Sequence, residues 1–337
     1  MDLAEVVSET LRPGAAVVVT DSNVGPRHAG AVVGDLESGG WRVLDVIEVP
    51  AGEASKSLTV YEEVIHRLAA SGITRDGTLF ALGGGVVGDL AGFAAATYMR
   101  GIALVALPTS LLAMVDSSVG GKTGVDLPEG KNLVGAFLRP RLVAADLARL
   151  DTLRDRELSC GLAEVVKMGL LAGGSFFDNL RLIGDARSRN AEALRTLVLD
   201  SVRFKADVVA EDELETGCRA ILNYGHTIGH ALEAVADYAL PHGEAIAVGM
   251  AAAAHLSREK SGTDLVALHE DLLRGAGLPT KAAADSEKVL AAMARDKKRR
   301  SGDGADHRFV LLEDVGRPVW GVPVTDGETR RAIEAIA

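Results

Sequence analysis

Short apolar runs rich in β-branched residues alternate with helical patterns in the first half of the chain. Between two of these runs, residues 57–71 carry apolar positions at helical spacing, and that pattern ends near Gly72. Strands separated by helices predict a parallel sheet covered on both faces. The runs predict strands at residues 15–20, 42–49, 78–82, 102–107 and 142–145.

After residue 150 the pattern becomes mainly helical. We therefore expect an α/β fold with a Rossmann-like parallel-sheet domain over residues 1–150 and a mainly α-helical domain over residues 151–337. The chain of 337 residues is long enough to give each domain its own core. Apolar or amphipathic patterns predict helices at 158–171, 194–209, 227–236 and 245–256, then a short strand at 309–312 and a helical tail.

A glycine-rich turn follows the third predicted strand. Gly83, Gly85 and Gly88 have the spacing of a dinucleotide-binding turn, in which glycines let a pyrophosphate approach the backbone. The alternative is a tight turn with no ligand. No acidic residue lies about twenty positions on, where the usual fingerprint has its ribose ligand. Asp21 or Glu53 would have to take that role.

A second polar, glycine-rich segment contains the triplet Gly-Lys-Thr at 121–123. A phosphate-binding P-loop is excluded, because Asp116 stands where that loop needs glycine. We expect a loop that carries Asp116, Lys122, Lys131 and Asn132. Solvated surface is the ordinary explanation for such lysines. A ligand-facing role is the alternative, since charged loops above a sheet are often functional.

Histidines cluster in the second half. His226 and His230 share a face of a predicted helix, and His242 precedes the next helix. Three imidazoles from two neighbouring segments can bind a divalent metal, although ordinary core or surface histidines are the alternative. In the helix at 158–171, Glu164 and Lys167 lie three apart. They form either a buried ion pair or a metal ligand with a neighbouring cation.

Charge and cysteine usage restrict the class of partner. A net charge of −11 and a pI near 5.3 argue against nucleic acid or an anionic membrane as partner, so an anionic ligand needs a local basic pocket. Two cysteines, Cys160 and Cys218, are too few for a disulfide framework. The N-terminus is acidic, unlike a signal peptide, and the longest apolar run is too short to cross a bilayer. We expect a cytoplasmic protein.

Six sequence blocks stand out in order along the chain: GGGVVGDLAGF, VDSSVGGKTGVD, GKNLVGAF, GLAEVVKMG, LNYGHTIGHALE and HGEAIAVGM. Together they resemble the blocks of the 3-dehydroquinate synthase family of sugar phosphate cyclases. The resemblance implies a lyase that converts 3-deoxy-D-arabino-heptulosonate 7-phosphate to 3-dehydroquinate and phosphate, a step of the shikimate pathway. It implies transient oxidation by NAD, phosphate elimination, reduction and intramolecular aldol closure, with Zn²⁺ or Co²⁺ as the metal, in a cytoplasmic homodimer.

Carried over position by position, the resemblance implies three sets of residues, and it reduces the three-histidine metal set to two histidines and a carboxylate. The metal set is Glu164, His226 and His242. The NAD set is Asp21, Asn23, Glu53, Lys56, Gly85, Val86, Val87, Gly88, Asp89, Thr109, Ser110, Lys122, Lys131, Arg149, Leu150, Asp151 and Thr152. The catalytic and substrate set is Asp116, Lys122, Asn132, Lys167, Lys205, Arg219, Asn223, His230 and Lys297, with Lys131 also facing substrate.

Alternatives within and outside the family stay open. Lys205, Arg219, Asn223 and His230 together favour dehydroquinate formation over inosose formation, but they leave an aminodehydroquinate synthase or another cyclase of secondary metabolism possible. A metal-dependent polyol dehydrogenase and an inactive NAD- or metal-binding module are further alternatives. Family members usually carry an additional strand pair before the first strand, so we expect the sheet edge to differ here.

Overall fold

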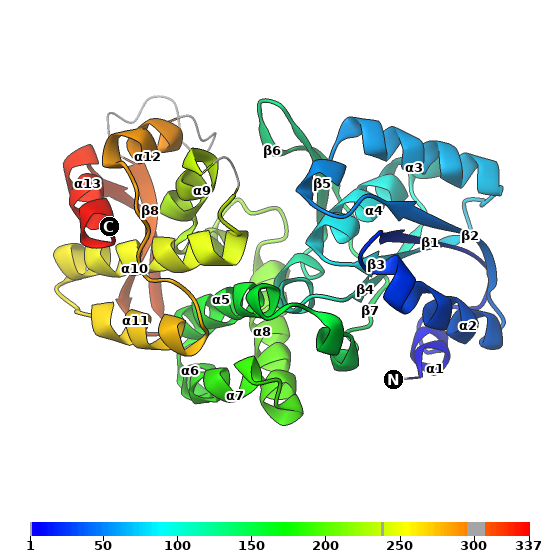
Figure 1. The fold of residues 1–337 in the computed structure, drawn as a ribbon, viewed down its shortest axis with the longest axis horizontal. Helices are drawn as coiled ribbons and strands as arrows, with labels where there is room; N and C mark the ends of the chain where they lie inside the picture. The colour runs from blue at the N-terminus through cyan, green and yellow to red at the C-terminus, as the bar shows by residue number, and fades with distance from the viewer. Residues whose placement is uncertain (1, 237–238, 295–306) are drawn as a thin grey trace. The chain divides into compact units, whose positions relative to one another are not determined.

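The computed structural model describes residues 2–236, 239–294 and 307–337 (Figure 1). The chain folds into two compact units, Met1–Leu153 and Arg154–Ala337. Among the described helices, none is both long and apolar enough to cross a membrane.

The first unit is built on a five-stranded parallel sheet in the order β2-β1-β3-β4-β7. All five predicted strands are present, although the last is shorter than expected. The chain moves from β1 to β2 on one side and then to β3 on the other side of β1. The strands are β1 (Ala15–Asp21), β2 (Arg42–Val49), β3 (Thr78–Gly83), β4 (Ala103–Pro108) and β7 (Leu142–Val143).

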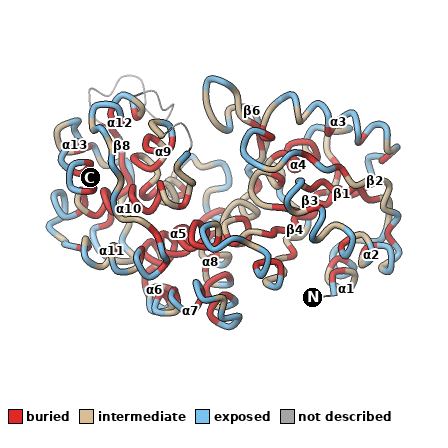
Figure 2. Tube along the Cα trace, viewed as in Figure 1, coloured by how far each residue is buried: buried red, intermediate tan, exposed pale blue. Residues whose placement is uncertain are grey.

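Helices cover both faces of this sheet (Figure 1). Alternate residues of β1 enter different cores, because successive side chains of a strand point to opposite faces. Val17 and Val19 pack with residues of α3 (Leu58–Ser71) and α4 (Gly85–Thr97). Ala16 and Val18 pack with residues of α1 (Leu3–Ser8) and α2 (Gly30–Ser38). Accordingly β3 is buried throughout, and β1 is buried except at its two end residues (Figure 2).

Local signals explain the limits of α3. The Ser57 side chain accepts a hydrogen bond from the Val60 amide at the helix start, as an N-cap does. Gly72 ends the helix in the left-handed conformation, with φ of 72°. Short 3₁₀ or π turns connect the remaining elements. They are η1 (Gly25–Ala29), η2 (Glu53–Ser55), η3 (Tyr98–Arg100), η4 (Ala113–Ser117) and η5 (Leu147–Thr152).

The glycine-rich segment that we expected to be a loop is an antiparallel hairpin, so that prediction was wrong. Its strands are β5 (Lys122–Leu127) and β6 (Gly130–Phe137). Gly124 pairs with Gly135, and a Cβ on Gly135 would lie 2.1 Å from the carbonyl oxygen of Thr123. The glycines that resembled loop signals therefore permit a close approach of two strands.

The second unit is mainly helical. The predicted helices are present, and α5 is buried from Leu158 to Leu171 (Figure 2). The helices are α5 (Asp155–Ala172), α6 (Gly174–Asn179), α7 (Ile183–Arg187), α8 (Ala191–Glu211), α9 (His226–Val235), α10 (His242–Ser261), α11 (Val266–Gly275), α12 (Ser286–Met293) and α13 (Asp326–Ala335), with short turns η6 (Leu180–Leu182) and η7 (Cys218–Asn223).

One hairpin accompanies these helices. The predicted strand at 309–312 is the longer β8 (His307–Asp314), and it pairs with β9 (Arg317–Val324). The apolar pattern did not predict β9, because Pro318, Gly321 and Pro323 interrupt its alternation. Such residues are tolerated in a strand that has a partner on one side only.

Candidate active site

The glycine turn lies at the carboxyl edge of the sheet in the first unit. In this sheet the strand order reverses between β1 and β3, and ligands of open α/β sheets bind outside the strand ends at such a point. Asp21 ends β1, and its Oδ1 accepts hydrogen bonds from the amides of Asn23 at 2.8 Å and Val24 at 3.0 Å. Gly83 ends β3, and α4 begins at Gly85.

The neighbouring strand contributes the next two residues of the NAD set. Thr109 follows β4, and its amide donates to the carbonyl of Gly83 at 2.9 Å. A Cβ on Gly84 would lie 3.4 Å from Oγ of Ser110, whereas a Cβ on Gly88 would meet no atom within 4 Å. The turn is therefore closely backed by Ser110 and open at Gly88, in the first turn of α4. Val86 is half-buried and Val87 is buried there.

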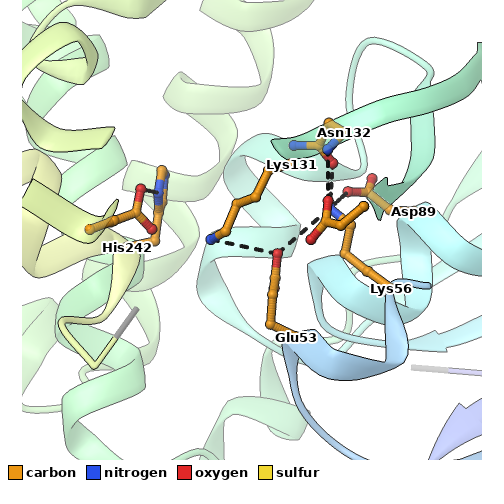
Figure 3. Close-up of polar contacts among 8 residues, drawn as sticks. Glu53, Lys56, Asp89, Lys131, Asn132 and His242 are labelled. Atoms are coloured by element: carbon orange, nitrogen blue, oxygen red, sulfur yellow. Dashed lines mark hydrogen bonds and ion pairs between the residues drawn. The ribbon is translucent and has the colours of Figure 1, made fainter. Parts of the chain in front are cut away.

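A buried lysine organises the polar groups beside this turn (Figure 3). Lys56 is 5% exposed, and its Nζ donates to Oδ2 of Asp89 at 2.8 Å and to Oδ1 of Asn132 at 2.5 Å. Glu53 lies 3.9 Å from Lys56 and 3.7 Å from Nζ of Lys131. Asn132 has a φ of 55°, a left-handed conformation that asparagine tolerates.

The remaining residues of the NAD set lie in η5. Arg149 and Leu150 are buried, whereas Asp151 and Thr152 are more exposed. Nε of Arg149 is buried without a hydrogen-bond partner. The sequence did not single out His28, whose Nε2 lies 2.9 Å from Oγ1 of Thr152 and so joins η1 to η5. A lone histidine in a turn gave no signal for that contact.

Two predicted residues of the catalytic set also belong to the first unit. Asp116 is half-buried in η4, and Lys122 is exposed at the start of β5. The structure places Lys122 on the hairpin that also carries Lys131 and Asn132.

Three side chains that lie far apart in sequence converge in the second unit. Glu164 comes from α5, and His226 and His242 are the first residues of α9 and α10. Nε2 of His226 lies 3.7 Å and Nε2 of His242 lies 3.6 Å from Oε1 of Glu164. One ligand atom from each residue lies within 4.8 Å of the others, so the three can share one metal ion.

Glycines bring the three helices close enough for this convergence. A Cβ on Gly249 of α10 would lie 2.1 Å from the carbonyl oxygen of Gly225, which precedes α9. A Cβ on Gly243 would lie 2.3 Å from Cα of Cys160 in α5. Because no side chain fits at these positions, the backbones approach directly and carry the adjacent histidines toward Glu164.

Hydrogen bonds at the far ring nitrogens orient both imidazoles. Nδ1 of His226 lies 3.0 Å from the carbonyl oxygen of Tyr224, which can only accept, so Nδ1 carries the proton and Nε2 keeps its lone pair. Nδ1 of His242 lies 3.4 Å from Oε2 of Glu233. Metal-bound histidines usually have such an acceptor behind them.

The charges around Glu164 are balanced within the second unit. Burial raises its pKa, but the Lys167 ammonium and the neighbouring His242 imidazole outweigh burial and lower the pKa to about 2. Burial and the neighbouring Lys167 hold the pKa of His226 well below its usual value. Burial lowers the pKa of His242, but the adjacent carboxylates of Glu164 and Glu233 outweigh burial and raise it to about 9.

The residues present fit a divalent metal. Glu164 is fully buried, and Lys167 forms an ion pair with it, yet neither carboxylate oxygen accepts a hydrogen bond of ordinary geometry. A buried carboxylate normally fills that capacity. Two imidazole nitrogens and one carboxylate make a donor set that Zn²⁺ or Co²⁺ accepts, and metal binding would displace the proton that His242 otherwise keeps.

Other predicted substrate residues lie in the same unit. His230 stacks edge-on against His226, with ring centroids 5.1 Å apart. Lys205 is buried on α8, which packs against η7, where Arg219 and Asn223 lie four apart. Nη1 of Arg219 donates to the Glu213 carbonyl at 2.5 Å, and Nδ2 of Asn223 donates to Oε1 of Glu215 at 2.9 Å. Lys297 lies outside the described residues.

Glu233 is a residue of this centre that the sequence did not single out. It lies on α9, three positions after His230, and it is 3% exposed. A carboxylate beside two histidines of one predicted helix was the available signal. That signal is weak, because a glutamate at this position is also typical of the polar face of an amphipathic helix.

Comparison with known proteins agrees with this arrangement. The family described as "3-dehydroquinate synthase N-terminal" matches residues 46–160, and "3-dehydroquinate synthase C-terminal" matches residues 161–299. A 3-dehydroquinate synthase of Acidithiobacillus ferrooxidans is 49% identical over 317 residues, covering 92% of this chain and 85% of the relative.

Solved structures of other cyclases share the fold. A 2-deoxy-scyllo-inosose synthase, complexed with carbaglucose-6-phosphate, NAD⁺ and Co²⁺, aligns with a TM-score of 0.90 at 30% identity, over 99% of this chain and 95% of that one. A 2-epi-5-epi-valiolone synthase from Streptomyces hygroscopicus, with NAD⁺ and Zn²⁺ bound, aligns with a TM-score of 0.88 at 26% identity, over 99% and 94%. Together the two family matches extend over residues 46–299, and the curated relative covers 92% of the sequence. The chain therefore belongs to the 3-dehydroquinate synthase family.

Proposed function

We propose that this chain converts 3-deoxy-D-arabino-heptulosonate 7-phosphate to 3-dehydroquinate and phosphate, as an NAD- and metal-dependent lyase. The convergence of Glu164, His226 and His242 is the observation that carries the proposal. These residues supply a metal-binding set inside a chain whose relatives at 45–49% identity are 3-dehydroquinate synthases.

NAD binding is proposed for the first domain, residues 1–150. NAD supplies reversible acceptance of a hydride from a substrate hydroxyl. The open first turn of α4 offers backbone amides and a helix N-terminus to a pyrophosphate. Asp21 ends the strand beside the turn, at the position from which a carboxylate can accept from a ribose hydroxyl. The NAD⁺ in the two solved cyclases supports this assignment.

Metal and substrate binding are proposed for the second domain, residues 151–337. A divalent metal supplies Lewis acidity toward a substrate hydroxyl. Glu164, His226 and His242 would hold it, and Lys167 offsets part of the carboxylate charge. His230, whose ring lies beside that of His226, is the residue proposed to exchange a proton with the substrate.

Cationic side chains must hold the substrate, because it carries a phosphate and a carboxylate while the chain has a net charge of −11. The buried Lys205 and Arg219 and the exposed Lys122 are the proposed contacts, with Lys131, Asn132 and Asn223 as further polar partners. Burial of Lys205 and Arg219 limits competing water and so strengthens their attraction for an anion.

Product identification tests this function. Enzyme, Zn²⁺, NAD⁺ and 3-deoxy-D-arabino-heptulosonate 7-phosphate should give 3-dehydroquinate and one phosphate per turnover, with no accumulation of NADH. NADH that accumulates without phosphate release would indicate a polyol dehydrogenase instead. Turnover of the amino analogue alone would indicate the aminodehydroquinate alternative.

A cytoplasmic homodimer is proposed as the working form. The two cysteines, Cys160 and Cys218, are free thiols, as reducing compartments favour. Light scattering of the purified chain should give twice the mass of 35.1 kDa, and a mass of one chain would reject the dimer.

A further inference from the structure

Among the described residues of the second unit, two candidate metal sets share one histidine. Glu164, His226 and His242 form the first set, and His230, Glu233 and His242 form the second. The function proposed above uses the first set. His242 can serve both sets only through different ring nitrogens. The role of Glu233 therefore decides which nitrogen of His242 is available to a metal.

The two nitrogens of His242 have different neighbours. Nε2 lies 3.6 Å from Oε1 of Glu164, and Nδ1 lies 3.4 Å from Oε2 of Glu233. We propose that Glu233 is a positioning residue for the metal centre: its carboxylate accepts a hydrogen bond from Nδ1–H of His242 and thereby leaves the Nε2 lone pair for a metal at Glu164 and His226. This inference rests on the metal site of the proposed function.

Burial and placement support a positioning role for Glu233. The residue is 3% exposed, and an isolated buried carboxylate is costly unless it is paired. It lies on α9, the helix that begins with the ligand His226, and α9 packs directly on α10 through Gly229 and Gly249. One helix thus supplies a ligand and the acceptor that orients the other histidine.

The state of the two carboxylates assigns the metal to the first set. Glu164 is fully buried, and neither of its oxygens has a hydrogen bond of ordinary geometry. Glu233 instead has an oxygen directed at an imidazole nitrogen. A carboxylate that holds the histidine behind a metal is a common arrangement, and its loss weakens metal binding by about 10- to 100-fold.

Metal binding to the purified full-length chain tests the inference without relying on activity. The variants are Glu233→Gln, which keeps shape and an acceptor, and Glu233→Ala, which removes the acceptor. Competition with a zinc chelator should give a Kd about 10- to 100-fold weaker for Glu233→Ala and an intermediate loss for Glu233→Gln. Stoichiometry should stay at one Zn²⁺ per chain, and the visible Co²⁺ spectrum should shift in band position.

Glu244→Gln is the matched control. Glu244 lies on α10 two residues after His242, and its carboxylate pairs with Arg156. This change should leave the zinc Kd within about twofold of wild type, since an ion pair with an exposed arginine contributes little.

Two outcomes would overturn the positioning role. One is that Glu233→Ala, which has no acceptor, binds Zn²⁺ with the Kd and Co²⁺ spectrum of wild type. The other is that both Glu233 variants lose the metal entirely while Glu164→Gln keeps it, which would make Glu233 a ligand. Failure of the proposed function looks different, because wild type itself would then bind no metal or release no 3-dehydroquinate.

Discussion

The hydroxyl of Tyr224 lies 2.8 Å from Nε2 of His269, and both side chains are fully buried. Nδ1 of His269 lies 2.8 Å from the carbonyl of Leu265, which can only accept, so Nδ1 carries the proton and Nε2 accepts from the tyrosine. The Tyr224 carbonyl in turn accepts from His226. Tyr224 therefore contacts α11 through its hydroxyl and a proposed metal ligand through its carbonyl.

Tyr224→Phe should destabilise the chain through this contact. The change leaves Nε2 of His269 buried without a donor, which costs about 1–3 kcal/mol. Adding His269→Leu removes the orphaned nitrogen, so the double variant should recover part of the loss. Urea unfolding of the four proteins in a double-mutant cycle measures the coupling. Strict additivity of the two changes would show that the contact has no energetic role.

Stability should fall in acid because His269 is buried as a neutral ring. Burial lowers its pKa to about 4, from 6.5 in an unfolded chain. Below pH 6.5 the unfolded chain binds the extra proton, so stability is lost as pH falls toward 4 and changes no further below it. The loss approaches about 1.4 kcal/mol per pH unit.

His269→Leu isolates that effect. Its unfolding free energy, measured in urea at pH 7, 6 and 5, should fall less steeply than that of wild type. The difference in slope should correspond to at most about one proton taken up on unfolding. Parallel pH profiles for the two proteins would show that another group titrates.

The apolar pattern predicted the sheet and the major helices because their burial follows a simple period. The same pattern missed β5 and β6, whose glycines allow strand contact instead of a turn. It also missed β9, where Pro318 and Pro323 interrupt the alternation.

The candidate site was less accessible from spacing alone. Spacing placed His226 and His230 on one face, but no local pattern pairs either with Glu164, which belongs to a distant helix. The residue types offered Glu164 as a candidate metal ligand, the resemblance selected His226 and His242 as its partners, and the structure brings the three together. Glu233 and His28 act through partners on other elements, so neither had a periodic signal.

Glycine substitutions should separate helix packing from ligand chemistry. Gly249→Ala would place a methyl group 2.1 Å from the Gly225 carbonyl oxygen, so α9 and α10 must move apart. A shift of His226 relative to His242 should weaken Zn²⁺ binding at least about tenfold, because metal sites tolerate little change in ligand distance. Chelator competition measures the Kd.

Gly184→Ala is the control for this prediction, since a Cβ there meets no atom within 4 Å. It should leave both folding and zinc affinity unchanged. Wild-type affinity in Gly249→Ala would mean that the helices accommodate the methyl group without moving the ligands.

Lys56 and Lys131 should differ in what their loss affects, although both lie near the proposed NAD site. Lys56 is 5% exposed and bonds Asp89 and Asn132, so Lys56→Met should cost about 1.5–3 kcal/mol of stability as well as weaken NAD binding. The Lys131 side chain is 31% exposed and lies 3.7 Å from Glu53. Lys131→Met should therefore change stability by less than about 1 kcal/mol while still raising KM for the sugar phosphate.

Urea unfolding and steady-state kinetics on both variants make the comparison. Equal stability of the two variants would mean that Lys56 does not anchor the β5–β6 hairpin.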